Sequence, residues 1–161
     1  MTAVAATPAR MARLEENLDR AADEVFSTMM GVRCLPVPDS ADAEREVLSA
    51  VIGLAGAMSG SMVLHSGSRA AMRIAERLTG IEPGEVDAVV RDAMGEVCNM
   101  VAGAWKGFDG TLACGCLLST PTVVSGSSYE LFTQRAPIRI ERTYRFEERT
   151  ITFSICCEFS S

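Results

Sequence analysis

Residues 85–107, EVDAVVRDAMGEVCNMVAGAWKG, carry a carboxylate and a carboxamide three positions apart, Glu96 and Asn99. In a helix this spacing places both side chains on one side, about one turn apart. Asp92 and Gly103 continue the same row at steps of four in either direction. A carboxylate can pair with a cation, and a carboxamide donates and accepts hydrogen bonds without titrating. The row could therefore engage a polar group that approaches the helix from solvent.

Two glycines lie in or beside this row, Gly95 and Gly103. Glycine in a helix interior costs about 1 kcal/mol relative to alanine, so its presence needs an explanation. An exposed helix face is usually filled with lysine and glutamate, whereas this row holds aspartate, glutamate, asparagine and glycine. The composition indicates that another molecule approaches this face closely. The alternative is a half-buried helix with a satisfied carboxylate, a capping-prone asparagine and packing glycines.

The spacing of apolar residues predicts the helix that carries the row. Gly84 and Gly107 flank the segment, and no proline interrupts it. Apolar side chains recur at steps of three and four, which is helical periodicity. They are Val86, Val89, Val90, Ala93, Val97, Met100, Val101 and Ala104. We therefore expect an amphipathic helix over residues 85–107.

Helices and paired strands are predicted on both sides of this segment. A helix over residues 11–30 ends at Gly31, and residues 1–10 are expected to be flexible. Strands over residues 44–54 and 61–65 form a hairpin, and a helix capped by Ser66 or Ser68 runs to Leu78. The strands expected after the central helix cover residues 111–118, 122–124, 129–133, 137–146 and 149–159.

The order of these elements predicts an α+β fold with two layers. Apolar residues make up 48% and charged residues 22% of the 161 residues, which is an ordinary globular balance. This length suits one domain over residues 1–161 with a substantial core. Long helices separated by strand hairpins predict a mostly antiparallel sheet that the helices cover.

The composition argues against several classes of protein. A formal net charge of −6 is unlike that of a nucleic-acid binder, which needs a basic surface. The chain has no run of about 18 apolar residues and no secretory signal, so we expect a cytoplasmic protein with six reduced cysteines and no membrane contact. There is no C-x-x-C pair and one histidine, His65, so we expect no metal site. Trp105 is expected to be a packing anchor.

The two principal helices match each other at an offset of 72 residues. Glu24 then falls on Glu96, Ser27 on Asn99, and Gly31 on Gly103. This match suggests an internal duplication that relates the two helices by a pseudo-twofold axis. Amphipathic patterning alone also produces such matches, so both explanations stay open.

Residues 92–103 resemble the signature helix of the CheC/CheX class of chemotaxis phosphatases. The run Asp92-Ala-Met-Gly-Glu96-Val-Cys-Asn99-Met-Val-Ala-Gly103 contains the E-x-x-N core of that helix. Residues 28–31, the glycines of residues 53–60 and the run Leu118-Ser-Thr-Pro-Thr-Val-Val-Ser-Gly126 are also similar to the CheX type. With the order of elements, the resemblance covers roughly residues 14–159.

This resemblance implies a phosphatase that acts on a CheY-like response regulator. The substrate would be an aspartyl phosphate on the regulator, which itself holds Mg²⁺, so no cofactor is expected in this chain. Glu96 would pair with the regulator's active-site lysine, and Asn99 would hold a water molecule in line with phosphorus. Asp92, Gly95 and Gly103 would contact the partner.

The first helix is expected to lack this activity. CheC-like proteins carry two signature helices and CheX-like proteins carry one. Ser27 occupies the asparagine position of the first helix, and it has a shorter reach and no amide. This difference favours the CheX type, which implies a homodimer joined through its sheets.

Two other functions stay open. The chain could be a non-catalytic module that docks a receiver domain, as a flagellar-switch-like adaptor would, or a purely structural dimer. Glu96 and Asn99 together favour the enzyme, because a docking surface has no need of both.

Overall fold

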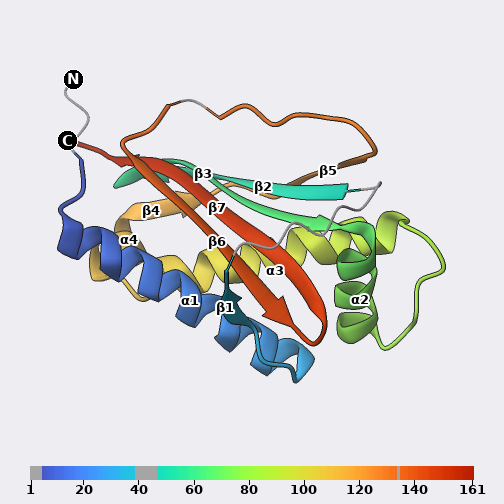
Figure 1. The fold of residues 1–161 in the computed structure, drawn as a ribbon. Coiled ribbons are helices and arrows are strands. Elements are labelled where there is room, and N and C mark those ends of the chain that lie inside the picture. Colours follow the sequence, from blue (N-terminus) through green and yellow to red (C-terminus); the bar gives the residue numbers. More distant parts are fainter. Residues whose placement is uncertain (1–4, 39–46, 134) are drawn as a thin grey trace.

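Seven antiparallel strands form one sheet, and the long helices pack against one of its faces (Figure 1). The computed structural model describes residues 5–38, 47–133 and 135–161. The helices are α1 (Pro8–Met30), α2 (Ser68–Thr79), α3 (Ala88–Gly107) and α4 (Gly110–Gly115). The strands are β1 (Leu35–Val37), β2 (Val47–Gly56), β3 (Met58–Gly67), β4 (Cys116–Leu118), β5 (Thr122–Gly126), β6 (Ile138–Phe146) and β7 (Arg149–Phe159). The predicted α+β fold is confirmed.

The sheet order is β1-β6-β7-β3-β2-β4, and β5 also pairs with β2. β4 and β5 therefore lie one after the other along the same side of β2. Residues 127–133 then pass over the face of the sheet opposite the helices (Figure 1). This arrangement places β5 beside α3 at one end of the sheet, which is where the polar row lies.

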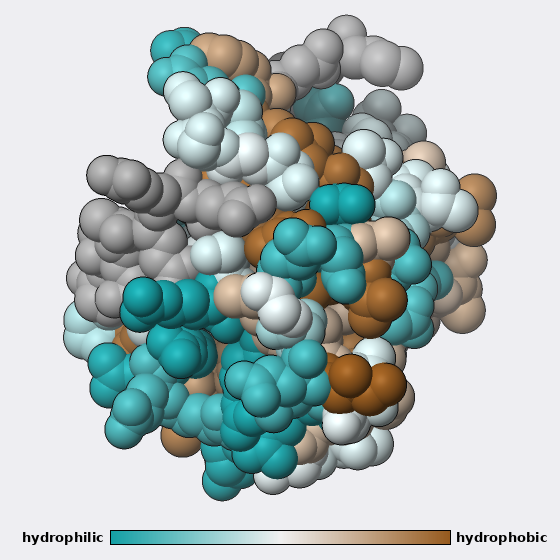
Figure 2. Space-filling model, turned by 90° about the vertical axis from the view of Figure 1, so that its right-hand side faces the viewer, coloured by the Kyte–Doolittle hydropathy of each residue, from teal (hydrophilic) through white to brown (hydrophobic). Residues whose placement is uncertain are grey.

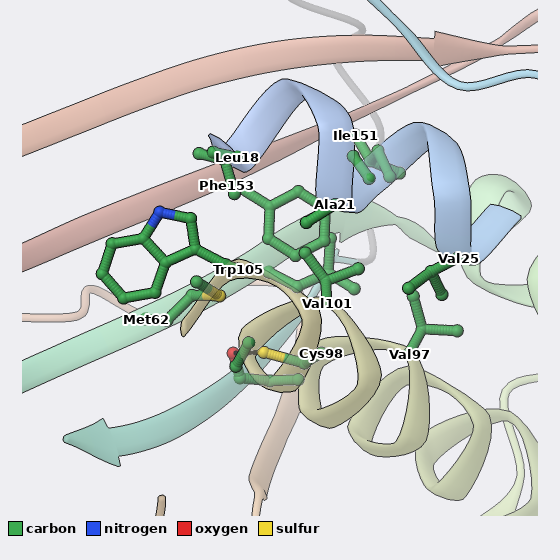
Figure 3. Close-up of a cluster of buried hydrophobic side chains, with 14 of the residues drawn as sticks. Leu18, Ala21, Val25, Met62, Val97, Cys98, Val101, Trp105, Ile151 and Phe153 are labelled. Atoms are coloured by element: carbon green, nitrogen blue, oxygen red, sulfur yellow. Dashed lines mark hydrogen bonds between the residues drawn. The ribbon is translucent and has the colours of Figure 1, made fainter. Parts of the chain in front are cut away.

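The core fills the space between α1, α3 and the sheet. In Figure 3, Leu18 of α1, Trp105 of α3 and Phe153 of β7 belong to one cluster of buried side chains. The Trp105 indole N–H donates a 3.0 Å hydrogen bond to the carbonyl of Leu14, so it joins α3 to α1. Trp105 is fully buried, and its predicted role as a packing anchor is confirmed.

Helix α3 begins at Ala88, three residues later than predicted. The side chain of Asp87 accepts a 3.0 Å hydrogen bond from the Val90 amide, which satisfies one of the free N–H groups at the helix start. An aspartate side chain forms hydrogen bonds with nearby backbone N–H groups, which favours the cap position over the helix interior. The helix therefore begins directly after Asp87. The row from Asp92 to Gly103 lies entirely inside the helix.

Other predicted boundaries need correction. Helix α1 begins at Pro8 rather than residue 11, because Thr7 caps it and accepts a hydrogen bond from the Arg10 amide. The N-cap of α2 is Gly67, which makes no side-chain cap bond, so neither predicted serine is the cap. Residues 44–46 of the predicted first strand and residues 1–4 lie outside the described residues.

Residues 111–118 were expected to form a strand, and this prediction is wrong for most of the segment. Residues 110–115 form α4, and only Cys116–Leu118 are a strand. The Asp109 side chain accepts hydrogen bonds from the amides of Thr111 at 3.0 Å and Leu112 at 3.3 Å, and these bonds start the helix. A short apolar run does not distinguish helix from strand by its pattern. Residues 129–133 are also not a strand.

The two predicted hairpins are present. β2 pairs with β3, and β6 pairs with β7 in a register that sets Ile138 opposite Cys157. Along β6 the inward side chains include Ile140 and Tyr144, and both are buried. The internal repeat stays a prediction, although Val25 and Val97, which are equivalent under it, point toward one another (Figure 3).

Candidate functional site

Helix α3 presents its polar row to solvent. Asp92 and Glu96 are exposed, and Asn99 is half-buried. The opposite face is closed, since Val97 and Val101 are fully buried. The two faces differ because the apolar residues follow the helical period and pack against α1 and the sheet, which leaves the row on the outside. The prediction that the carboxylate and the carboxamide lie on the outer side of the helix is thus confirmed.

Neither Glu96 nor Asn99 has a side-chain partner in the described part of the chain. Among the residues that the structure describes, no hydrogen bond from another side chain and no ion pair engages Glu96, Asn99 or Asp92. An exposed carboxylate that contacts only solvent can form an ion pair with a cationic group of another molecule. This finding counts against the alternative of a half-buried helix with a satisfied carboxylate.

A hollow of about 480 Å³ lies beside Glu96, between α3 and the start of β5. Its lining comes from one face of α3 and from the segment that leads into β5. The lining residues are Arg91, Asp92, Gly95, Glu96, Pro121 and Val123. The hollow is wide and open, so it suits a protruding group of another protein better than a small molecule that must be enclosed.

The two glycines of the helix have different surroundings. A Cβ atom at Gly95 would lie 3.2 Å from Pro121 Cγ and 3.4 Å from Val123 Cγ2, so Gly95 makes room for the chain's own β5 segment. A Cβ atom at Gly103 would meet nothing within 4 Å. We expected both glycines to admit a partner. Only Gly103 is open in this way, while Gly95 is buried and forms the floor of the hollow.

Lys106 anchors the carboxyl-terminal end of α3. Its ammonium donates hydrogen bonds to the carbonyls of Ala113 at 3.2 Å and Cys116 at 2.8 Å. Together with the Trp105 bond to α1, these contacts fix the last turn of the helix that presents the row. A positioned group is effective in catalysis only when its support is fixed in this way.

The corresponding row of α1 is occupied by internal contacts. Glu24 lies 3.9 Å from Arg20 in an ion pair. The Ser27 hydroxyl is 3.4 Å from an Asp23 carboxylate oxygen and 3.4 Å from the carbonyl of Val32. Ser27 takes the position that Asn99 has on α3, and its hydroxyl is directed to the chain itself.

Sequence reasoning missed one hydrogen-bonded chain on the other face of the sheet. Ser49 Oγ lies 2.8 Å from His65 Nδ1 and 2.9 Å from the Tyr129 hydroxyl. Ser49 and His65 are directly opposite in the β2–β3 register, so only the register could have revealed the pair. Ser49 is fully buried, and the group therefore attaches residues 127–133 to the sheet rather than exposing a nucleophile.

All six cysteines are free thiols, and five of them are buried, with Cys114 the exception. Burial raises the pKa of Cys98 and that of Cys157 to about 12. They behave as small apolar residues. Within the described ranges, no group of three or more His, Cys, Asp and Glu side chains is placed to hold a metal ion. No helix in this part of the chain is long and apolar enough to cross a membrane.

Comparison with known proteins gives a family and a set of similar structures. The family model described as "Chemotaxis phosphatase CheX" matches residues 48–141. The structure of the chemotaxis protein CheX from Vibrio vulnificus is 26% identical, with a TM-score of 0.77, over 92% of this chain and 98% of that one. No curated protein matches.

Two further structures share the fold at lower identity. CheX from Desulfovibrio desulfuricans is 22% identical over 90% of this chain and 99% of that one, with a TM-score of 0.75. A CheX–CheY–BeF3–Mg²⁺ complex from Borrelia burgdorferi contains a chain that is 19% identical over 88% of this chain and 96% of that one, with a TM-score of 0.68.

Proposed function

This chain belongs to the CheX family of chemotaxis phosphatases, and we propose on that basis that it hydrolyses the aspartyl phosphate of a CheY-like receiver domain. The observation that carries the proposal is the pair Glu96 and Asn99, which faces solvent from one rigid helix with no partner in the described part of the chain. A similar protein is found in complex with CheY, BeF3 and Mg²⁺, and this complex supports a receiver domain as the partner.

Glu96 orients the receiver on the helix. Its carboxylate pairs with the lysine of the receiver's phosphorylation site, and the pair gains strength as the interface excludes water. Because Glu96 carries no ion pair of its own, pairing with the receiver breaks no existing contact. Loss of this carboxylate should therefore weaken both the association and the turnover.

Asn99 positions the nucleophile. An amide donates and accepts at once, so it can hold a water molecule in line with phosphorus at any pH at which the fold is stable. The water oxygen forms the new bond to phosphorus, the bond from phosphorus to the aspartyl oxygen breaks, and the products are inorganic phosphate and the free aspartate carboxylate. An acyl phosphate is already reactive, so alignment is the main task.

The receiver itself supplies the metal. The Mg²⁺ lies with the phosphoryl group on the partner and spreads the charge that develops on its oxygens. No residue of this chain is assigned to that ion. Asp92, Gly95 and Gly103 are proposed to contact the receiver around the catalytic pair: Asp92 as a second anionic group, Gly95 through the floor of the hollow, and Gly103 through its open surface.

The proposal extends to assembly and location. We propose a homodimer joined through the sheets, and a place in the cytoplasm with the receiver domains on which the protein acts. Light scattering of the purified protein tests the dimer directly, since a monomeric mass of 17.2 kDa would overturn it.

The test of the activity follows phosphate release from a phosphorylated CheY-type receiver with and without this protein. The expected result is multiple turnover at a rate well above the receiver's own hydrolysis. If several receivers from the same organism bind the protein but lose phosphate no faster, the chain is an adaptor that docks receivers without hydrolysis.

A further inference from the structure

Val89 extends the partner-facing row toward the start of α3. It lies three residues before Asp92, which places it on the same side of the helix. The sequence pattern assigned Val89 to the buried stripe, but the side chain is 50% exposed, while its neighbour Val90 is fully buried. The helix begins at Ala88, so Val89 lies in its first turn, at the amino-terminal end of the row.

A single exposed valine needs no explanation by itself, because much of any protein surface is apolar. Seven large apolar side chains are exposed in the described part of the chain, and they are spread over several elements. They are Met29, Leu35, Ile81, Val89, Leu117, Leu131 and Phe132. Val89 is the one among them that lies on α3. The side of the molecule that Figure 2 shows has apolar areas mixed with hydrophilic ones.

Acidic side chains outnumber basic ones on the stretch around Val89. Glu85, Asp92 and Glu96 precede or follow it on the same stretch, and none of them has an ion pair among the described residues. The nearest cation on the helix is Arg91, whose side chain reaches back to the Val86 carbonyl at 3.4 Å. An apolar contact beside a mostly acidic rim fits a partner surface that is apolar at its centre and basic at its edge.

Distance along the helix places Val89 within reach of an interface at Glu96. Val89 and Glu96 are seven residues apart, which is about 10 Å along the axis. A stable protein interface buries about 800 Å² on each partner, a patch roughly 30 Å across. An interface of this size centred on Glu96 would therefore include Val89.

We infer that Val89, within the acidic rim of Glu85 and Asp92, is a specificity contact for the receiver domain that this phosphatase binds. The inference rests on the proposed function, which supplies the partner. The favoured receiver carries an apolar side chain beside its phosphorylation pocket, surrounded by lysine or arginine. Val89 contributes to binding and not to the chemical step, because it lies two turns away from the reacting atoms.

The test measures affinity and turnover separately in three variants. The probe is a CheY-type receiver domain loaded with Mg²⁺ and BeF3⁻, and its dissociation constant is measured by titration calorimetry. Val89→Gln should weaken binding about tenfold, because burying about half a valine surface is worth roughly that factor and the amide must also lose water. Val89→Leu should bind as the unaltered protein does. Met29→Gln is the matched control, since Met29 is 49% exposed on α1, and it should change nothing.

Steady-state kinetics with the phosphorylated receiver gives the second measurement. Val89→Gln should raise KM by the same factor as the dissociation constant and leave kcat unchanged. Sodium chloride should weaken binding of the unaltered protein, because it screens the acidic rim, and Asp92→Asn should reduce that salt dependence. Circular dichroism of each variant confirms that the helix is intact.

The outcomes separate the inference from the proposed function. If Val89→Gln binds and turns over like the unaltered protein while the latter is active, Val89 is not a contact and the proposed function stands. If the unaltered protein binds the receiver without accelerating hydrolysis, the enzyme proposal fails, and the affinity of Val89→Gln still decides the inference. If no receiver binds at all, both are wrong.

Discussion

Pro121 packs directly against the backbone of Gly95, so that an added Cβ atom at position 95 would lie 3.2 Å from Pro121 Cγ. This contact fixes the segment before β5 beside the proposed catalytic pair and forms one wall of the hollow at Glu96. The glycine serves the chain's own packing, whereas the open surface at Gly103 faces solvent. The two positions should therefore respond differently to the same substitution.

Gly103→Ala should stabilise the protein by about 1 kcal/mol, because alanine is the better helix former and meets nothing within 4 Å. Gly95→Ala should stabilise it less or destabilise it, since Pro121 must move by a few tenths of an ångström. Urea denaturation of the two variants measures both effects. Equal stabilisation at the two positions would contradict the packing described for Gly95.

The same Gly103→Ala variant should lose affinity for the receiver. The added methyl group occupies surface that the partner is proposed to approach, and small changes in a well-packed interface are felt. Calorimetric titration with the receiver loaded with BeF3⁻ and Mg²⁺ checks this. If the variant is more stable and binds the receiver with an unchanged dissociation constant, Gly103 is not part of the proposed interface.

Acid should weaken the contact between α2 and the β6–β7 turn. Arg73, through a hydrogen bond, and Arg77 hold the pKa of Glu147 at about 2, below its usual value of 4.5. A carboxyl whose folded pKa is lowered adds stability above its unfolded pKa, and this stability is lost as the pH falls from about 4.5 to about 2. Because Glu147 is partly exposed, solvent limits the effect to on the order of 1 kcal/mol.

Glu147→Gln tests this assignment without altering the backbone, which has a positive φ of 51° at this turn. Urea midpoints measured at pH 6, 4 and 3 should fall less steeply in the variant than in the unaltered protein. The same pH dependence of the urea midpoint in both proteins would show that the contacts of the two arginines do not require the charge of Glu147.

Tyr129→Phe should loosen residues 127–133. The variant loses the hydroxyl that lies 2.9 Å from Ser49 Oγ, so the segment loses one of its attachments to the sheet. The buried Ser49 keeps its bond to His65, and for this reason the sheet itself should stay intact. Hydrogen exchange followed by mass spectrometry should show faster exchange in this segment alone. Unchanged exchange there would mean that other contacts hold it.

The α1 face should be dispensable for catalysis. Glu24→Ala should leave turnover within about twofold of the unaltered protein, because a surface substitution that only breaks a 3.9 Å ion pair costs little. Phosphate release measures it, with Glu96→Ala as the matched change on α3. A large loss in Glu24→Ala would show that α1 also contributes to the activity.

The helices and strands with a long, regular spacing of apolar residues were predictable from the sequence. Short segments whose structure depends on a single cap were not. The helix of Glu96 and the β6–β7 hairpin have long, regular apolar patterns, so their type was predicted correctly, and so were their faces apart from Val89. Residues 110–115 are too short for a pattern, and the Asp109 cap decides their helical state.

The site was predictable to a similar extent. The row from Asp92 to Gly103 follows from spacing on a single helix, and its exposure follows from the opposite apolar stripe. The surroundings of Gly95, the exposure of Val89 and the meeting of Ser49 with Tyr129 depend on how distant segments pack. Spacing along one element carries no information about such contacts.

The central claim is that Asn99 orients the attacking water while Glu96 holds the receiver. The most direct measurement compares kcat and receiver affinity in Asn99→Ala with those of the unaltered protein. Loss of one positioned polar group typically lowers kcat about 100-fold or more, so we expect that fall with a dissociation constant for the BeF3⁻-loaded receiver that is nearly unchanged. Turnover by Asn99→Ala at the rate of the unaltered protein would contradict the mechanism.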